Sequence, residues 1–390
     1  MNTQKPAPVL FKVIRFITGL IFIFSGFIKA NDPVGFAYKL EEYFIVFGWD
    51  FLQPLSIPIA ILLCGIEILL GAFLLLGLWR KLTTWGLLLL IIFFTFLTFY
   101  SAYFEVVTSC GCFGDAIPLT PWQSFSKDVV LLIFIGYIFI QRHKIHPVFT
   151  DRYTQNIVTA AIVVIAIGIG IYTYNFLPFF DFLPYKKGNN IPELMEIPEG
   201  AVLDEYETIY HLKHSGTGEE KTMNDTQYLE TGIWKDDAWE IMGTPESHLV
   251  KAGYQPPIYD LIISDSTGQD QTQAIINQPG YHLIIVAYDI KDASEKGLKA
   301  IAELADTLKK VHNIPSVLLT SSSFAMARTK LEQQGINFNL MFADAVPLKS
   351  MVRANPGVLL MKAGTVIKKW HYHVLPSLKR LEKKHLHANE

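Results

Sequence analysis

The 390-residue sequence predicts a helical membrane bundle followed by a water-soluble α/β domain, and three observations support this prediction. Hydrophobic residues make up 51% of the chain and charged residues only 18%, against about 25% in an ordinary soluble domain. The composition changes near residue 181: the first part holds 11 Lys or Arg and 10 Asp or Glu, and the remainder holds 22 and 26. Five long apolar stretches precede this point, and short strands and helices alternate after residue 258.

The charge balance excludes some classes of function. The formal net charge is -3, whereas a general electrostatic grip on nucleic acid needs a basic excess. The sequence also has no nucleotide-binding glycine loop, zincin helix or serine-hydrolase elbow. We therefore expect a lipid bilayer as partner and no nucleic acid.

The five apolar stretches are long enough to cross a bilayer, because about 20 helical residues span its hydrocarbon core. They cover residues 9–30, 55–79, 82–104, 124–141 and 157–178. The first has no small-residue cleavage site before Asp32, so we expect it to be retained rather than removed as a signal peptide. The fourth carries Lys127 and Asp128 near its start, and if the helix begins at Trp122 we expect these charges at the membrane interface.

The distribution of Lys and Arg predicts the orientation. The N-terminal segment and the loops around residues 80–81 and 142–152 carry eight of these residues, and the opposite segments carry five. This difference predicts that the N-terminus is cytoplasmic. The loops 31–54 and 105–123 and the C-terminal domain are then expected on the periplasmic side.

Two of the three cysteines lie in the outer loop Thr108-Ser109-Cys110-Gly111-Cys112-Phe113-Gly114-Asp115. Disulfides persist in the oxidising compartment predicted for this loop. A bridge across one glycine closes almost no loop and stabilises the fold little, and a strained, exposed bridge is labile. We therefore predict that Cys110 and Cys112 are redox-active, with a passive clip or two free thiols as alternatives. The outer loops have no His to complete a tetrahedral set, so no metal is expected.

Two further residues of chemical interest lie in the second apolar stretch. Glu67 follows Cys64 by one turn on the same helix face. A carboxyl group inside a membrane helix is a hypothesis of function, and Glu67 would relay protons when thiols or a quinone are oxidised or reduced. The alternative is a protonated packing residue. Cys64 is either a third redox partner or a small buried hydrophobe. Lys29 and Asp32, at the outer end of the first helix, are expected to form an interfacial anchor pair.

Three segments of the membrane region resemble the DoxX superfamily. They are Ser25-Gly26-Phe27-Ile28-Lys29-Ala30-Asn31-Asp32-Pro33, Glu67-Ile68-Leu69-Leu70-Gly71 and Cys110-Gly111-Cys112-Phe113-Gly114. They are most similar to the methylamine-utilisation MauE branch, in the longer form found in Bacteroidetes, and the resemblance covers roughly residues 10–142. It implies a four-helix bundle in a bacterial inner membrane and a role in disulfide formation or maturation of exported proteins. DoxX relatives belong to quinone-linked complexes, so the resemblance makes a quinone a candidate cofactor and establishes none. Unlike vitamin K epoxide reductase and DsbB, this sequence has no Cys-x-x-Cys in a membrane helix.

The second half of the chain has two parts. Residues 182–257 are interpreted as a linker and a small β-rich extension with a strand at Glu207–Leu212. From residue 258 the periodicity predicts alternating elements. The expected strands are 261–264, 282–288, 316–320, 338–342, 357–361 and 366–370, and the expected helices are 295–311 and 323–334.

This order resembles the thioredoxin superfamily, in which a cis-proline precedes the terminal hairpin, and Pro356 matches that position. The segment Asp289–Ser294, where the active site would stand, has no cysteine, so this domain cannot perform dithiol exchange itself. Asn355-Pro356-Gly357 would bind an extended client peptide or be an inert remnant of the fold. His371 and His373 are expected to be exposed on one strand face without a third metal ligand.

These observations predict a four-helix domain (1–150), a fifth transmembrane helix (151–181), a β-rich extension (182–257) and a thioredoxin-like domain (258–390). The leading hypothesis is a membrane thiol–disulfide oxidoreductase or electron-transfer protein that acts on periplasmic clients. Cys110 and Cys112 would react with the client, and Glu67 would handle protons. The competing hypothesis is a non-enzymatic envelope scaffold or assembly subunit with a peptide-binding domain.

Overall fold

The computed structural model describes residues 8–106, 111–251 and 253–386, and for Gly111 and Cys112 it describes the backbone alone. The chain divides into two compact units. The first consists of Met1–Asn189 and Ile262–Glu390, and the second consists of Asn190–Leu261. The first unit holds the apolar helices and a five-stranded sheet, and the second holds a separate small sheet.

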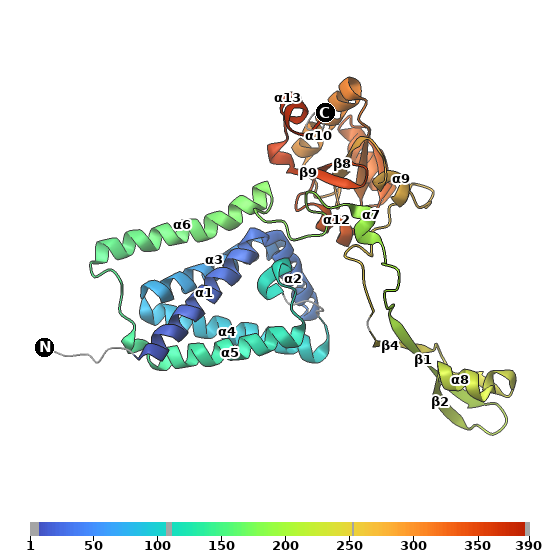
Figure 1. Ribbon diagram of the computed structural model, residues 1–390, viewed down its shortest axis with the longest axis horizontal. Coiled ribbons are helices and arrows are strands. Elements are labelled where there is room, and N and C mark those ends of the chain that lie inside the picture. Colours follow the sequence, from blue (N-terminus) through green and yellow to red (C-terminus); the bar gives the residue numbers. More distant parts are fainter. Residues whose placement is uncertain (1–7, 107–110, 252, 387–390) are drawn as a thin grey trace. The chain divides into compact units, whose positions relative to one another are not determined.

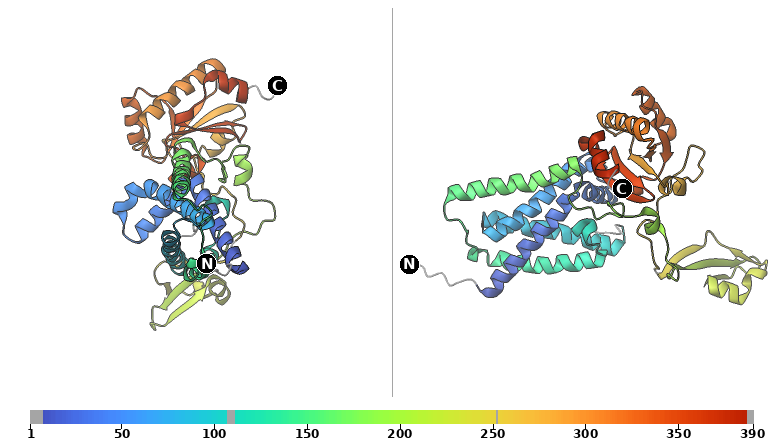
Figure 2. Two further views of the ribbon diagram at one scale, coloured as in Figure 1. Left: turned by 90° about the vertical axis from the view of Figure 1, so that its left-hand side faces the viewer. Right: turned by 45° about the horizontal axis from the view of Figure 1, so that its top comes forward.

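Five helices in the described part of the chain are long and apolar enough to cross a membrane, which confirms the five predicted stretches. They are α1 (Val9–Asn31), α3 (Ser56–Leu76) with the preceding turn η1 (Asp50–Leu55), α4 (Arg80–Phe104), α5 (Pro121–Ile140) and α6 (Arg152–Phe176). Figures 1 and 2 show these helices lying side by side.

Large apolar side chains of four helices form the core of the bundle. Phe22 of α1, Leu74 of α3, Leu87 of α4 and Ile135 of α5 are all buried in one cluster. Helices α1 and α3 approach closely because glycines face each other between them: a Cβ on Gly71 would lie 2.7 Å from the Gly19 carbonyl oxygen. Helix α6 packs on α3 outside this core.

The chain between the first two spans contains a helix that the sequence analysis did not predict, α2 (Pro33–Val46). Its start is well defined, because Asp32 caps it by accepting a hydrogen bond of 2.9 Å from the Gly35 amide. Pro33 occupies the first position, where its missing N–H has no partner to lose. The Asp32-Pro33 pair is thus the sequence signal for this helix.

Helix α5 begins earlier than predicted. Thr120 and Gln123 form a capping box, in which the Gln123 amide donates to Thr120 Oγ1 (3.3 Å) and the Thr120 amide donates to Gln123 Oε1 (3.0 Å). With the helix starting at Pro121, Asp128 lies two turns inside it and is buried. The helix starts within one residue of Trp122, the start on which the interfacial expectation for Lys127 and Asp128 depends, and that expectation stays a prediction.

The sheet of the first unit has the strand order β7-β6-β5-β8-β9, of which Figure 1 labels β8 and β9. The strands are β5 (Tyr281–Val286), β6 (Ser316–Thr320), β7 (Asn339–Phe342), β8 (Gly357–Lys362) and β9 (Thr365–His371). β5, β6 and β7 are parallel, whereas β8 is antiparallel to β5 and to β9. Residues Leu283 to Val286 are completely buried, as expected for a central strand covered on both faces.

Helices connect and cover these strands. They are α9 (Thr272–Ile276), α10 (Glu295–His312), α11 (Phe324–Gln333), α12 (Ala345–Met351), α13 (Leu378–Leu381) and the terminal turns η5 (Tyr372–Val374) and η6 (Glu382–Leu386). Helix α10 buries Leu298, Ile301 and Leu308 against the sheet, as its periodicity predicts. α12 was not predicted from the sequence.

Two predictions about this domain were wrong. Residues 261–264 do not form a strand: Ser264 alone makes isolated bridges, because the turn held by the Asp265 carboxylate begins directly after it. His371 and His373 do not share a strand face. β9 ends at His371, which is buried, and His373 lies in the following turn with its amide donating to His371 Nδ1 (3.2 Å).

The second unit is a small antiparallel sheet around the long strand β1 (Glu205–His214). β1 pairs with β2 (Glu220–Asn224), β3 (Trp239–Ile241) and β4 (Glu246–Lys251). The short helices α7 (Ile191–Met195) and α8 (Asp225–Thr231) and the turn η4 (Ile233–Lys235) complete it. The strand predicted at Glu207–Leu212 lies within β1.

Candidate functional site

A buried ion pair joins α1 and α3 in the bundle. The Lys29 ammonium group pairs with Glu67 Oε1, and the two side chains are 4% and 2% exposed. Ser25, one turn before Lys29, donates a hydrogen bond of 2.9 Å to Glu67 Oε2. The Lys29 nitrogen also lies 4.7 Å from the ring centre of Phe94 and 5.1 Å from that of Phe36. The structure thus corrects the expectation that Lys29 and Asp32 form an interfacial anchor pair.

A second ion pair in the bundle belongs to α5. Lys127 Nζ lies 2.7 Å from Asp128 Oδ1, and Thr98 of α4 donates a hydrogen bond of 3.0 Å to Asp128 Oδ2. The Asp128 side chain is only 2% exposed. A carboxylate inside a membrane helix marks a functional hypothesis wherever it occurs, so the argument that singled out Glu67 applies equally to Asp128.

Both ion pairs line one small cavity between α1, α3, α4 and α5. Its volume is about 20 Å³, which is room for a single water molecule. The remaining lining residues are Ile21, Phe22, Ser25, Ile91, Phe94 and Leu131. The arrangement brings two carboxylates and two ammonium groups to one water-sized space within an otherwise apolar core. We call the four residues Lys29, Glu67, Lys127 and Asp128 the charged cluster.

The residue after the Cys-Gly-Cys segment contacts this cluster. Phe113 lies in the turn η2 (Gly111–Ala116), with its ring centre 5.6 Å from that of Phe24 in α1 and 5.1 Å from Lys127 Nζ. Gly114 adopts a φ of +51°, which a glycine accommodates without strain. Cys110 and the side chain of Cys112 lie outside the described residues, so the prediction of a redox-active pair stays a prediction.

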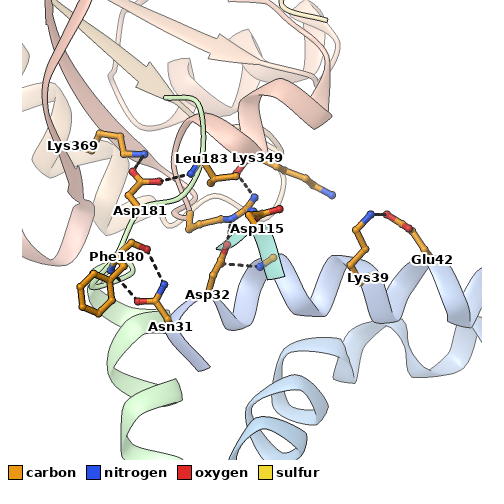
Figure 3. A network of polar contacts seen from close by, with 12 residues as sticks. Asn31, Asp32, Lys39, Glu42, Asp115, Phe180, Asp181, Leu183, Lys349 and Lys369 are labelled. Carbon is orange, nitrogen blue, oxygen red and sulfur yellow. Dashed lines mark hydrogen bonds and ion pairs between the residues drawn. The ribbon is translucent and has the colours of Figure 1, made fainter. Parts of the chain in front are cut away.

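Asp115, two residues further, contacts the α/β domain through Arg353. Arg353 Nε lies 2.7 Å from Asp32 Oδ2, and its Nη2 lies 3.4 Å from Asp115 Oδ2. Figure 3 labels the two aspartates. Its Nη1 donates to the Lys349 carbonyl oxygen at 2.6 Å. The guanidinium is 7% exposed. Burial acts to lower its pKa, but the two aspartates prevail and the pKa of Arg353 is raised, so this cation stays charged.

A second group of contacts holds the same domain at the end of α6. Lys369 of β9 forms an ion pair of 2.5 Å with Asp181 (Figure 3). Asn31 at the end of α1 exchanges two hydrogen bonds with the backbone of Phe180, at 2.8 and 3.0 Å. His373 Nδ1 hydrogen-bonds to the Asn175 carbonyl oxygen at 3.0 Å. Burial lowers the pKa of Lys369, and Asp181 opposes this shift.

The predicted client-binding loop lies directly after Arg353. The Asn355–Pro356 peptide bond is cis, and Pro356 and Gly357 are buried. Asn355 Nδ2 donates to the Asp289 carbonyl oxygen at 2.8 Å, and the Ser294 amide donates to the Asn355 carbonyl oxygen at 3.1 Å. The structure therefore brings this loop together with the cysteine-free segment Asp289–Ser294.

Cys64 is completely buried in an apolar cluster with Ala30, Ile68 and Ala166. The residues that sequence reasoning missed are Asp128, Arg353 and Asp181. Asp128 carried a usable signal, whereas Arg353 is one of many charged residues in a soluble domain, and its partners are 321 and 238 positions away in the sequence.

Comparison with known proteins agrees with the membrane assignment. Residues 7–141 match the family model of the methylamine utilisation protein MauE. Protein TlpB of Flavobacterium psychrophilum is 27% identical over 182 residues, which are 45% of this chain and 45% of TlpB. The matched part thus spans less than half the length of this curated relative. The chain is a membrane protein with a MauE-like region followed by an α/β region.

Proposed function

We propose that this protein exchanges disulfides with dithiol partners at the outer face of a bacterial inner membrane, through Cys110 and Cys112. One observation carries the proposal. The residues that follow Cys112 contact the charged cluster through Phe113 and the α/β domain through Asp115. The Cys-Gly-Cys segment is therefore connected, through the turn that follows it, to the charged cluster and to the soluble domain.

The exchange balances without a further reactant. A thiolate of the partner attacks one sulfur of the Cys110–Cys112 disulfide, whose S–S bond breaks as a mixed disulfide forms. The second partner thiolate then displaces the protein sulfur from the mixed disulfide. The partner loses two electrons and two protons as its disulfide forms, and Cys110 and Cys112 take up both as thiols. The reverse sequence reduces a partner disulfide.

Glu67 supports this chemistry by holding a proton or releasing it. Its carboxylate accepts from Ser25 and pairs with Lys29 in a space without bulk water, and the water-sized cavity separates it from Asp128. The two pairs together form a reservoir for the protons that the thiols gain or lose.

A quinone does not fit the charged cluster, because a cavity of about 20 Å³ is far smaller than a quinone ring. The apolar groove between α3 and α6 is larger, about 570 Å³. Among the residues that line this groove, only Tyr174 has a polar group in its side chain. A quinone site needs several polar groups that point towards the ligand. We therefore include no quinone in the reaction.

The α/β domain is proposed to be thioredoxin-like. The order β7-β6-β5-β8-β9, with β5 to β7 parallel and β8 and β9 antiparallel, supports this assignment. The competing function is a non-enzymatic envelope scaffold. The two ion pairs between this domain and the membrane region support a scaffold as much as they support disulfide exchange.

The test is a rate of exchange. The full-length protein in lipid nanodiscs is mixed with a short peptide that contains two thiols, and formation of the peptide disulfide is followed by mass spectrometry. We expect Cys110→Ser and Cys112→Ser each to abolish the reaction and Cys64→Ser, in its buried apolar cluster, to retain it. If wild type and Cys110→Ser are equally inert, the scaffold function holds instead.

A further inference from the structure

We propose that the Arg353 loop of the α/β domain (residues 352–357) docks on the chain's own η2 turn (Gly111–Ala116), which follows Cys110, and so positions the two cysteines for reaction. The occupant of this loop is then the membrane domain rather than an external client peptide. Arg353 is a positioning residue, because it acts on the cysteines through Asp115. This inference rests on the proposed function and names the internal partner of the α/β domain.

Arg353 links the α/β domain to the membrane domain. Its guanidinium connects three parts of the chain: the start of α2 at Asp32, the η2 turn at Asp115 and the end of α12 at the Lys349 carbonyl oxygen. A buried cation with two carboxylate partners is a specific contact, since leaving the charge unpaired costs several kcal/mol.

The ion pair between Arg353 and Asp115 lies only a few residues from the cysteines along the chain. Asp115 follows Cys112 by three residues, and three residues span at most about 10 Å even when fully extended. The Asp115 side chain is itself 53% exposed, so the Arg353 contact rather than burial fixes it. The position of Arg353 thus limits where the Cys112 backbone can lie.

One face of the α/β domain contacts helix α2 of the membrane domain. Lys349 Nζ lies 4.1 Å from the ring centre of Tyr38 in α2 and 5.8 Å from that of Tyr288, which directly precedes the Asp289–Ser294 segment. Arg353 also lies 5.6 Å from the Tyr38 ring centre. The face that carries the cis-proline loop and the cysteine-free segment is therefore the face in contact with the membrane domain. A client peptide at that loop would compete with α2.

A general loosening of the domain is the rival explanation for any effect of Arg353, and the chain offers a matched control. Lys369 is also a buried cation paired with an aspartate, but it joins the domain to Asp181 after α6 and has no contact with η2 among the described residues. Lys369 Nζ also donates to the Met351 carbonyl oxygen at 3.0 Å. In Lys369→Gln the side-chain amide remains a donor for that oxygen, whereas the ion pair with Asp181 is lost. We expect this variant to loosen the same domain without releasing Asp115.

The experiment compares Arg353→Gln with Lys369→Gln in the full-length protein in nanodiscs. The first readout is amide hydrogen exchange of residues 111–116, which does not depend on any activity. The second is the rate of disulfide exchange with the dithiol peptide. We expect Arg353→Gln to raise hydrogen exchange in this segment and to slow disulfide exchange about tenfold or more, since small displacements of reacting groups have such effects.

Further variants sharpen the comparison. Arg353→Lys should restore part of both readouts, because an ammonium group reaches one of the two carboxylates. Lys369→Gln should leave both near wild type. Equal effects of Arg353→Gln and Lys369→Gln, or unchanged hydrogen exchange in Arg353→Gln, would overturn the inference while leaving the proposed function intact. A wild-type protein that exchanges no disulfide refutes the proposed function, and with it the positioning role, even if Arg353→Gln releases the segment.

Discussion

Removing one partner of the Lys29–Glu67 ion pair should destabilise the bundle far more than removing both. Both side chains are almost completely buried, so neither charge can be solvated when the other is lost. Lys29→Met keeps an unbranched side chain, one atom shorter, and leaves the Glu67 carboxylate with the Ser25 hydroxyl as a donor. It also removes the contacts of the ammonium group with the Phe36 and Phe94 rings.

The size of the effect follows from burial. Breaking a buried ion pair by removing one partner costs about 3–5 kcal/mol, whereas replacing both partners by apolar residues of similar volume is often neutral. We therefore expect about 3–5 kcal/mol for Lys29→Met and a much smaller loss for the double variant Lys29→Met/Glu67→Met. Lys39→Met is the control, because the Lys39–Glu42 pair (2.8 Å) is partly exposed and such pairs contribute about 0–1 kcal/mol (Figure 3).

The assay is reversible unfolding of the full-length protein in mixed micelles, followed by far-UV circular dichroism as the denaturing detergent increases. Lys29→Met should shift the midpoint strongly and Lys39→Met hardly at all. The reasoning about burial fails if the two single variants lose equal stability, or if the double variant is less stable than Lys29→Met.

Three further predictions concern other parts of the first unit. Asp128→Asn breaks the ion pair with Lys127 but keeps an acceptor for Thr98, so we expect a loss of about 1–3 kcal/mol in the same unfolding assay and slower disulfide exchange; an unchanged exchange rate would remove Asp128 from the reservoir. Burial lowers the pKa of His371 from 6.5 to about 4, which favours its neutral form in the folded state. The contribution of this shift to the free energy of unfolding is complete above pH 6.5 and decreases as the pH falls towards 4, by about 2 kcal/mol at pH 5. Hydrogen exchange of the β8 amides, measured against pH, should show this decrease in wild type and not in His371→Asn. Gly77→Ala should lower the unfolding midpoint clearly, because Gly77 has a φ of 70° and a Cβ there would lie 2.2 Å from the His146 carbonyl oxygen, whereas Gly136→Ala, with open space around it, should not.

The sequence was sufficient for the elements whose signal is local. Five spans were predicted because about 20 consecutive apolar residues leave few alternatives, and α10 because its apolar residues recur with the helical period. Helix α2 was missed, since the apolar residues of its 14-residue length do not form a long run, although Asp32-Pro33 marks its start. The capping box at Thr120, which sets the start of α5 at Pro121, was not recognised in the sequence.

The contacts between distant segments could not be predicted from local patterns. Nothing in the sequence near Arg353 specifies Asp32 or Asp115 as its partners, and Lys369 is one of two adjacent lysines in β9. Glu67 was identified because a carboxyl group inside a membrane helix is energetically costly. Its partner Lys29 was not identified, because the burial of Lys29 depends on how α1 packs against α3. Helix packing in three dimensions decides these pairings.

The most direct test of the account is the redox state of the cysteines in native membranes. The membranes receive a pulse of a dithiol reductant or of a disulfide oxidant, the protein is denatured and alkylated, and its mass is measured. The account predicts three alkyl groups after the reductant and one, on Cys64, after the oxidant. The same number of alkyl groups under both conditions would show that Cys110 and Cys112 do not cycle, and would contradict the proposed exchange.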